Sequence, residues 1–184
     1  LLGRPIETVL TAASPSGKDI VLLNEYDDFG RPYSEYLPVP VATSSGGYAD
    51  PLRIKVANSF YNWEVYAFSK TLYDDSPLDR PVEEYGPGSP WHTREKSVRT
   101  TYLVNDDSGL LSCSGYLVES DTSLTCVGTL PSGNLNVVKV TDEDGNVSLT
   151  FTDKLGRKAL ERTVDGERYQ DIYYVYDDLG LLRY

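Results

Sequence analysis

A short turn motif recurs along the chain and constrains its fold more than any other feature. An aromatic or β-branched residue is followed, directly or after one residue, by Asp, two residues, Gly and then Arg or Asn. The Asp and Gly of the copies stand at Asp27 and Gly30, Asp142 and Gly145, Asp153 and Gly156, and Asp177 and Gly180. YDDSPLDRP (73–81) is a degenerate copy with Pro in place of Gly, and in the last copy Leu181 replaces Arg or Asn.

The chemistry of this motif is that of a β-turn between two strands. Its Asp can accept a hydrogen bond from a backbone N–H two residues on, and its Gly suits a position with positive φ. The flanks alternate with a period of two, which is typical of strands; Val147, Leu149 and Phe151 share one face. We therefore predict a mainly β fold, an antiparallel sheet built from hairpins.

The expected strands follow from this alternation. They are 5–10, 20–26, 31–36, 65–73, 81–85, 97–104, 110–119, 123–129, 134–141, 147–152, 157–164 and 169–176. One segment instead has helical spacing. Asp50 is a good N-cap, Pro51 suits a first turn, and Leu52, Val56 and Phe60 fall on one stripe, which predicts a short helix over about 51–62. We expect YGPGSPWHT (85–93) to be a loop.

Length and charge restrict the class of protein. A chain of 184 residues suits one domain, 1–184, and the scarcity of clean turn copies between about 45 and 130 indicates a diverged insertion. The net charge of −11 would be repelled by a phosphate backbone, so we expect no nucleic-acid partner. No apolar run approaches the ~20 residues that cross a membrane, so we expect no membrane insertion. The absence of Met suggests a piece of a longer protein.

The sequence holds no recognisable metal or cofactor motif. Cys113 and Cys126 have no zinc-site spacing; they could form a disulfide across a hairpin or remain free, partly buried thiols. In DEDGNVSLTFTD (142–153) Gly145 is the fourth residue, whereas a calcium loop needs Gly at the sixth. We therefore predict no bound metal and no cofactor, and leave open whether the acidic turns bind calcium weakly.

The paired acids and the lone histidine carry no clear catalytic signal. Adjacent Asp residues on one turn do not face each other across a substrate, as the two carboxylates of a glycosidase must. His92 has no nucleophile or acid beside it that would suggest a triad. We therefore interpret the Asp as turn residues and His92 as structural or solvated.

Tyrosine is unusually common, with fifteen Tyr against four Phe. A Tyr or Trp ring can stack on a sugar, and it can equally pack in a sheet with its polar tip exposed. The candidate carbohydrate face comprises Tyr61, Trp63, Tyr66 and Trp91, although roles in the core or in cross-strand pairs explain aromatic residues of this kind as well.

Together these motifs resemble the tyrosine–aspartate (YD, or RHS) repeats of very large bacterial surface and secreted proteins. The order of blocks is similar to a non-enzymatic domain of unknown function that lies upstream of the repeat array in RHS-type proteins of gut bacteria. The matching blocks are GRP (3–5), SPSGKDIV (14–21), the EYDDFGR and EYLP segment (25–37), YAFSKTLYDDSPLDR (66–80), GPGSPW (86–91), TDEDGN (141–146), DKLGR (153–157) and YYVYDD (173–178).

The resemblance implies a β scaffold or shell, outside the cell, whose partner is the rest of the parent YD-repeat protein. It implies no catalytic residues here, because no motif matches the self-cleaving aspartates of the family's core domain. One alternative is a carbohydrate-binding module that uses exposed Tyr and Trp. A second is a polysaccharide hydrolase, which would need two facing carboxylates about 5–10 Å apart.

Overall fold

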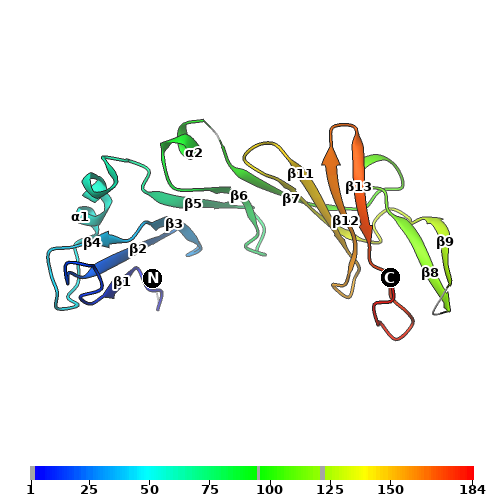
Figure 1. Ribbon diagram of the computed structural model, residues 1–184, viewed down its shortest axis with the longest axis horizontal. Helices are drawn as coiled ribbons and strands as arrows, with labels where there is room; N and C mark the ends of the chain where they lie inside the picture. Colours follow the sequence, from blue (N-terminus) through cyan, green and yellow to red (C-terminus); the bar gives the residue numbers. More distant parts are fainter. Residues whose placement is uncertain (1–2, 95, 121–122) are drawn as a thin grey trace. The chain divides into compact units, whose positions relative to one another are not determined.

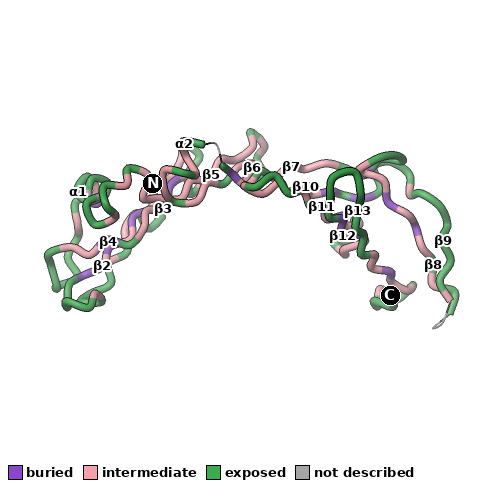
Figure 2. The backbone as a smooth tube through the Cα atoms, turned by 45° about the horizontal axis from the view of Figure 1, so that its top comes forward, coloured by how far each residue is buried: buried purple, intermediate pink, exposed green. Residues whose placement is uncertain are grey.

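The computed structural model describes residues 3–94, 96–120 and 123–184, and it is mainly β as predicted (Figure 1). The chain divides into two compact units, Leu1–Val98 (unit 1) and Arg99–Tyr184 (unit 2). The strand pairs whose register the structure describes are antiparallel. Buried residues form a separate small core in each unit (Figure 2). The prediction of one domain with an insertion at about 45–130 stays a prediction.

Unit 1 is a hairpin-built sheet with short helices. Its strands are β1 (Glu7–Leu10), β2 (Ile20–Tyr26), β3 (Pro32–Tyr36), β4 (Val39–Pro40), β5 (Phe68–Tyr73) and β6 (Pro81–Tyr85). They pair in the order β1-β2-β3-β5-β6, and β4 pairs with β2. All but β4 overlap a predicted strand; β4 was missed because two prolines flank its only valine. The core is small, with Val21, Leu23, Val39 and Ile54 buried.

The predicted helix exists, but it is divided into two short helical segments, and a different face of it is buried. Helix α1 (Pro51–Lys55) begins at the expected N-cap, where Asp50 Oδ1 accepts a hydrogen bond from Leu52 N at 3.0 Å. A 3₁₀ turn, η1 (Ala57–Tyr61), follows it. The predicted stripe faces outward, because Ile54 is the residue that packs into the core while Leu52 and Val56 are exposed.

A second helix lies where we expected a loop. Helix α2 (Ser89–Thr93) carries Pro in its first turn, a position that Pro tolerates because no N–H is needed there. The Trp91 ring lies against Gly86, where a Cβ would come within 2.6 Å of the ring atom Cε2. The prediction of a loop over 85–93 was wrong for Ser89–Thr93, because Gly and Pro were taken as loop residues, whereas Pro90 stands in the first turn of a helix.

Unit 2 contains five sheet strands that pair in series, and one hairpin. The series runs β7-β10-β11-β12-β13, and the hairpin pairs β8 with β9. The strands are β7 (Val98–Val104), β8 (Ser114–Ser120), β9 (Ser123–Thr129), β10 (Asn136–Thr141), β11 (Val147–Thr152), β12 (Lys158–Asp165) and β13 (Arg168–Tyr173); a 3₁₀ turn, η2 (Gly109–Leu111), precedes β8. Each strand overlaps a predicted one, and η2 takes the start of the strand predicted at 110–119.

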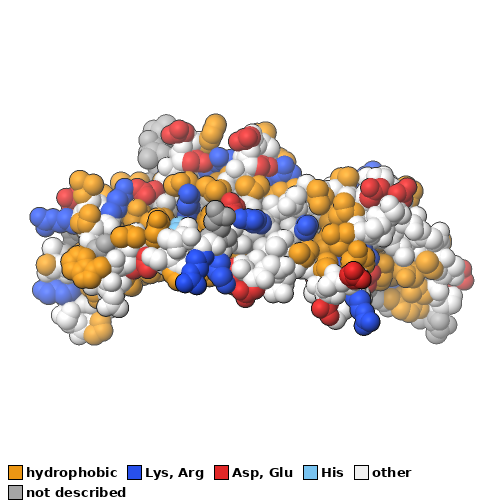
Figure 3. Space-filling model, turned by 90° about the horizontal axis from the view of Figure 1, so that it is seen from above, with side chains coloured by type: hydrophobic (Ala, Val, Ile, Leu, Met, Phe, Trp, Pro, Cys, Tyr) orange, Lys and Arg blue, Asp and Glu red, His pale blue; other side chains and the backbone are white. Residues whose placement is uncertain are grey.

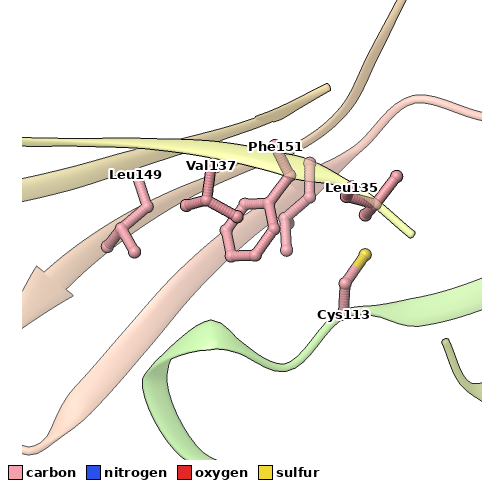
Figure 4. Close-up of a cluster of buried hydrophobic side chains, with 6 residues drawn as sticks. Cys113, Leu135, Val137, Leu149 and Phe151 are labelled. Carbon is pink, nitrogen blue, oxygen red and sulfur yellow. The ribbon is translucent and has the colours of Figure 1, made fainter. Parts of the chain in front are cut away.

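One row of side chains forms the core of unit 2. The strand register places Leu103, Val137, Phe151, Leu160 and Tyr173 side by side across the five strands. Cys113 and Leu135 cover this row from the chain that leads into and out of the hairpin (Figure 4). Because side chains alternate between the two faces of each strand, one residue from each of the five strands contributes to a single packed layer.

Both cysteines are free thiols in this structure. Cys113 is buried in the core and Cys126 is exposed on β9. The backbone explains why they do not meet, since Cys126 pairs with Tyr116, whereas Cys113 O accepts a hydrogen bond from Leu130 N at 2.8 Å. The two residues are thus offset along the hairpin, and a disulfide between them does not form here.

Candidate functional site

The Asp27 turn shows how the repeated motif is held. Asp27 Oδ1 accepts hydrogen bonds from Phe29 N at 3.0 Å and Arg31 N at 2.8 Å. Asp27 Oδ2 accepts one from Arg31 Nε at 2.7 Å. Gly30 closes the turn at φ +79, a conformation that glycine adopts without steric cost. A single carboxylate therefore organises the whole turn.

The two regular turns of unit 2 repeat this arrangement. Asp153 accepts hydrogen bonds from Leu155 N at 2.9 Å, Arg157 N at 2.9 Å and Arg157 Nε at 2.7 Å. In the Asp142 turn, Asn146 replaces Arg and donates from both N and Nδ2, each at 2.8 Å. In these turns the Asp carboxylate accepts the backbone N–H groups, and Gly145 and Gly156 take positive φ.

The two irregular copies also contain an Asp–Arg ion pair, but their Arg stands farther along the chain. Asp74 accepts from Arg80 Nε at 2.8 Å, and Asp177 accepts from Arg183 Nε at 2.7 Å. In both, the Arg stands six residues after the Asp rather than four. Sequence reasoning missed these partners and treated Leu181 as the loss of the Arg; the shared six-residue spacing was the signal that could have found them.

Arginines of the turns also stack on tyrosines of later turns. The guanidinium carbon of Arg4 lies 5.7 Å from the centre of the Tyr26 ring, and that of Arg31 lies 4.7 Å from Tyr73. In unit 2, Arg157 lies 4.9 Å from Tyr176. Each of these tyrosines stands directly before the Asp of a later turn along the chain. We call each such contact a rung; a cation–π contact of this kind contributes about 0.5–1 kcal/mol at an exposed site.

The turn glycines leave room for the same arginines. A Cβ on Gly30 would lie 2.4 Å from Arg4 Nη1, and one on Gly180 would lie 3.3 Å from Arg157 Nη1. Gly156 takes the same φ of +79 as Gly30, yet nothing lies within 4 Å of its Cβ position. At these two turns the glycine therefore allows the positive φ of the turn and also leaves room for the arginine of the rung.

The environment of each turn carboxylate lowers its pKa, which favours the ionised form. Burial acts to raise the pKa of Asp27 and of Asp153, but hydrogen bonds from Arg31 and Arg157 outweigh it and hold each pKa below its usual value. The same balance, with hydrogen bonds from Ser76 and Arg80, lowers the pKa of Asp74. The pKa values of the other two, Asp142 and Asp177, are also lowered, chiefly by hydrogen bonds from Asn146 and Leu181 respectively.

These lowered pKa values predict loss of stability in acid. A carboxyl whose folded pKa lies below its unfolded value of 3.8 contributes fully above that pH and loses its contribution as pH falls through the folded pKa. We expect the urea midpoint to fall steeply between about pH 4 and pH 2, and less steeply in an Asp27→Asn, Asp153→Asn variant. An equal decline in the variant and the parent chain would contradict a role for these carboxylates.

The four residues of the predicted carbohydrate face, Tyr61, Trp63, Tyr66 and Trp91, differ in their contacts, and this face stays a prediction. The Tyr66 ring stacks on His92 at 4.6 Å, and His92 stacks in turn on Tyr85 at 5.4 Å. Tyr61 donates its hydroxyl to Pro38 O, and Trp91 packs on Gly86. Trp63 is 72% exposed. In the part of the chain that the structure describes, no ring contact joins any two of the four.

A buried aspartate that sequence reasoning missed fixes the loops of unit 1. Asp19 is fully buried and accepts hydrogen bonds from Ala12 N at 2.8 Å, Thr43 Oγ1 at 2.8 Å and Gly46 N at 2.9 Å. Burial acts to raise the pKa of Asp19, but these hydrogen bonds outweigh it and lower the pKa. Its neighbours lie 7 to 27 residues away along the chain, so no local pattern marks it.

A family model described as a domain of unknown function (DUF6443) matches residues 2–104, which is more than half of the chain. The chain belongs to this family. No curated protein matches it. The DUF6443 match contains the Asp27 and Asp74 turns and both rungs of unit 1, and the family description names no activity.

Two further observations concern the described residues alone. None of their helices has the length and apolar character required to cross a membrane. Within the same ranges, no three His, Cys, Asp or Glu residues converge as metal ligands would.

Proposed function

We propose that this DUF6443 chain is a non-catalytic scaffold or shell segment of a large bacterial YD-repeat (RHS-type) protein, exposed on the cell surface or secreted. The observation that carries this proposal is the set of rungs, in which the Arg of one turn covers the Tyr of the next. Its partner would be the rest of the parent protein.

The chemistry of the carboxylates supports a structural role. The first Asp of each turn already receives backbone N–H groups and a side-chain donor, which leaves it poorly suited to move protons. Arg31 is similarly occupied, because it binds Asp27, approaches Asp79 at 3.7 Å and donates to Asp74 O at 3.1 Å. Such contacts tie consecutive hairpins together without requiring a ligand or cofactor.

A paired substitution tests the proposal. Asp27→Ala removes the acceptor of three hydrogen bonds, one of them charge-assisted on both sides, and should lower the free energy of unfolding by about 2–3 kcal/mol. Asp28→Ala changes the exposed neighbour and should stay within about 0.5 kcal/mol of the parent chain. Both tryptophans lie in unit 1, so urea unfolding followed by tryptophan fluorescence reports on the correct unit.

Equal effects of the two substitutions would show that the turn carboxylate does not carry the scaffold, and would overturn the proposal. A carbohydrate-binding module is the second candidate, favoured by the exposure of Trp63. A polysaccharide pulldown with the parent chain and Trp63→Ala separates the two candidates. Binding that is lost in Trp63→Ala would favour the module, and absence of binding by the folded chain would favour the scaffold.

A further inference from the structure

A cavity of about 510 Å³ lies beside α1 in unit 1. Its floor is apolar, because it is formed by the buried side chains of Val39 on β4 and Ile54 on α1, together with Val41. Figures 1 and 2 show α1 next to β4, and in Figure 3 hydrophobic side chains reach the surface at this end of unit 1. A cavity of this volume, with an apolar floor and a few polar groups, is the usual form of a small-molecule site.

Arg53 supplies a positive charge at the wall of this cavity. Its side chain is exposed, and among residues 3–94, 96–120 and 123–184 no acid or carbonyl group binds its guanidinium. The next cation on α1, Lys55, is by contrast paired with Glu25. A guanidinium whose donors are all free suits a carboxylate, which it can bind through two parallel hydrogen bonds.

Asp50 places a negative charge at the same wall. Its Oδ1 accepts a hydrogen bond from Leu52 N at 3.0 Å, and no group within the described ranges of the chain binds its Oδ2. Within those ranges no ion pair joins Asp50 to Arg53 either, so the two charges do not neutralise each other. The backbone N–H groups of Arg53 and Ile54 donate to Asp50 O, so only the side chains offer free polar groups here.

The charges at the wall indicate a ligand that carries both signs. A chain of net charge −11 repels an anion, but it does not repel a compound without net charge. A short peptide with free termini meets this condition, because it has one carboxylate and one ammonium group. Its two charges are separated by at least one peptide bond, which suits two wall groups that do not pair with each other. Apolar side chains on the peptide would cover the apolar floor.

We propose that this cavity binds a short apolar peptide with free termini. The peptide carboxylate pairs with Arg53, its ammonium group pairs with Asp50, and its side chains pack on Val39 and Ile54. Tyr48 also lines the cavity and is 71% exposed, so its ring can cover the bound peptide. This inference goes beyond the proposed scaffold function and does not depend on it.

Isothermal titration calorimetry of the unaltered chain with the dipeptide Leu-Leu tests the proposal. We expect saturable binding of one peptide per chain with a Kd below about 1 mM, as is usual for a ligand of this size in a well-formed site. Three analogues each remove one feature: N-acetyl-Leu-Leu lacks the ammonium group, Leu-Leu amide lacks the carboxylate, and Gly-Gly keeps both charges without apolar side chains. Each analogue should bind at least about tenfold more weakly than Leu-Leu.

Two variants of the wall assign the ends of the peptide. Arg53→Gln should raise the Kd for Leu-Leu at least about tenfold and should no longer distinguish Leu-Leu from its amide. Asp50→Asn removes the negative charge but keeps the N-cap of α1, because Asn caps a helix as well as Asp does. This variant should no longer distinguish Leu-Leu from N-acetyl-Leu-Leu. Arg168→Gln is the matched control on β13, an exposed position outside the cavity, and should leave the Kd unchanged.

Several outcomes would overturn the proposal. Absence of binding by the folded chain even at about 10 mM Leu-Leu would do so, as would binding that neither Arg53→Gln nor Asp50→Asn weakens. Equal binding of Gly-Gly would show that the apolar floor is not used, and equal binding of both blocked dipeptides would show that the charged wall is not used. Circular dichroism of each variant confirms folding, and the three analogues give a readout on the unaltered chain.

Discussion

Replacing Arg162 with alanine should lower the free energy of unfolding of unit 2 by about 3–5 kcal/mol. Arg162 lies on β12 and its side chain is only 5% exposed. Its Nε and Nη2 donate to the two carboxylate oxygens of Asp171 at 2.8 and 2.7 Å. Its Nη1 donates to Leu110 O at 2.8 Å and Ser112 O at 2.9 Å. The substitution would leave one carboxylate and two carbonyls without these donors.

The position of Arg162 explains the size of this effect. The guanidinium joins the sheet, through Asp171 on β13, to the 110–112 segment that leads into the hairpin. It also lies 4.7 Å from the centre of the Tyr169 ring and 5.7 Å from that of Phe151. Loss of this side chain should therefore loosen the hairpin as well as the sheet.

Urea unfolding by circular dichroism and amide exchange of β8 and β12 measure the change. Arg168→Ala is the matched control, because it removes the same group from an exposed position on β13 and should stay within about 0.5 kcal/mol. If Arg162→Ala is no more destabilising than Arg168→Ala, the hydrogen bonds of the Arg162 guanidinium do not hold unit 2 together.

Replacing Asn105 with alanine should cost about 3 kcal/mol, the second-largest effect that we expect. Asn105 is fully buried at the end of β7. Its Oδ1 accepts from Leu135 N at 2.7 Å, and its Nδ2 donates to Pro131 O at 2.9 Å and Leu130 O at 3.3 Å. An alanine leaves a buried N–H and two carbonyls unsatisfied at the point where the chain leaves the hairpin for β10.

Asp107→Ala is the control for this substitution, since Asp107 is exposed two residues along the same loop. Asn105→Asp is a sharper variant: it keeps the shape and the acceptor for Leu135 N but removes the donors and sets a carboxylate oxygen against two carbonyls. We expect Asn105→Asp to destabilise as much as Asn105→Ala in urea unfolding at neutral pH. A neutral effect of both variants would contradict the structural role of Asn105.

The two residues with the largest expected effects were not predicted from the sequence, because their partners lie far away along the chain. Arg162 bonds with groups about 50 residues earlier, and Asn105 with groups 25 to 30 residues later. An isolated Arg or Asn in a sequence looks the same whether it faces solvent or closes a buried network. Only the paired strands decide which groups it meets.

The sequence by itself determined the parts of this protein that depend on local physics. Alternation with a period of two predicted the strands, because neighbouring side chains of a strand must point to opposite faces. Turn chemistry predicted the positions of Asp27, Gly30 and their counterparts, because Asp binds N–H groups two and four residues away and Gly takes positive φ.

The tertiary structure decided what depends on distant segments. It placed Arg4 over Tyr26 and Arg31 over Tyr73, turned the helix so that Ile54 rather than Leu52 is buried, and offset Cys113 from Cys126. Each of these outcomes follows from strand register and hairpin order, which bring together residues far apart in sequence. A local pattern specifies which side chains share a face, but only the assembled sheet determines what that face contacts.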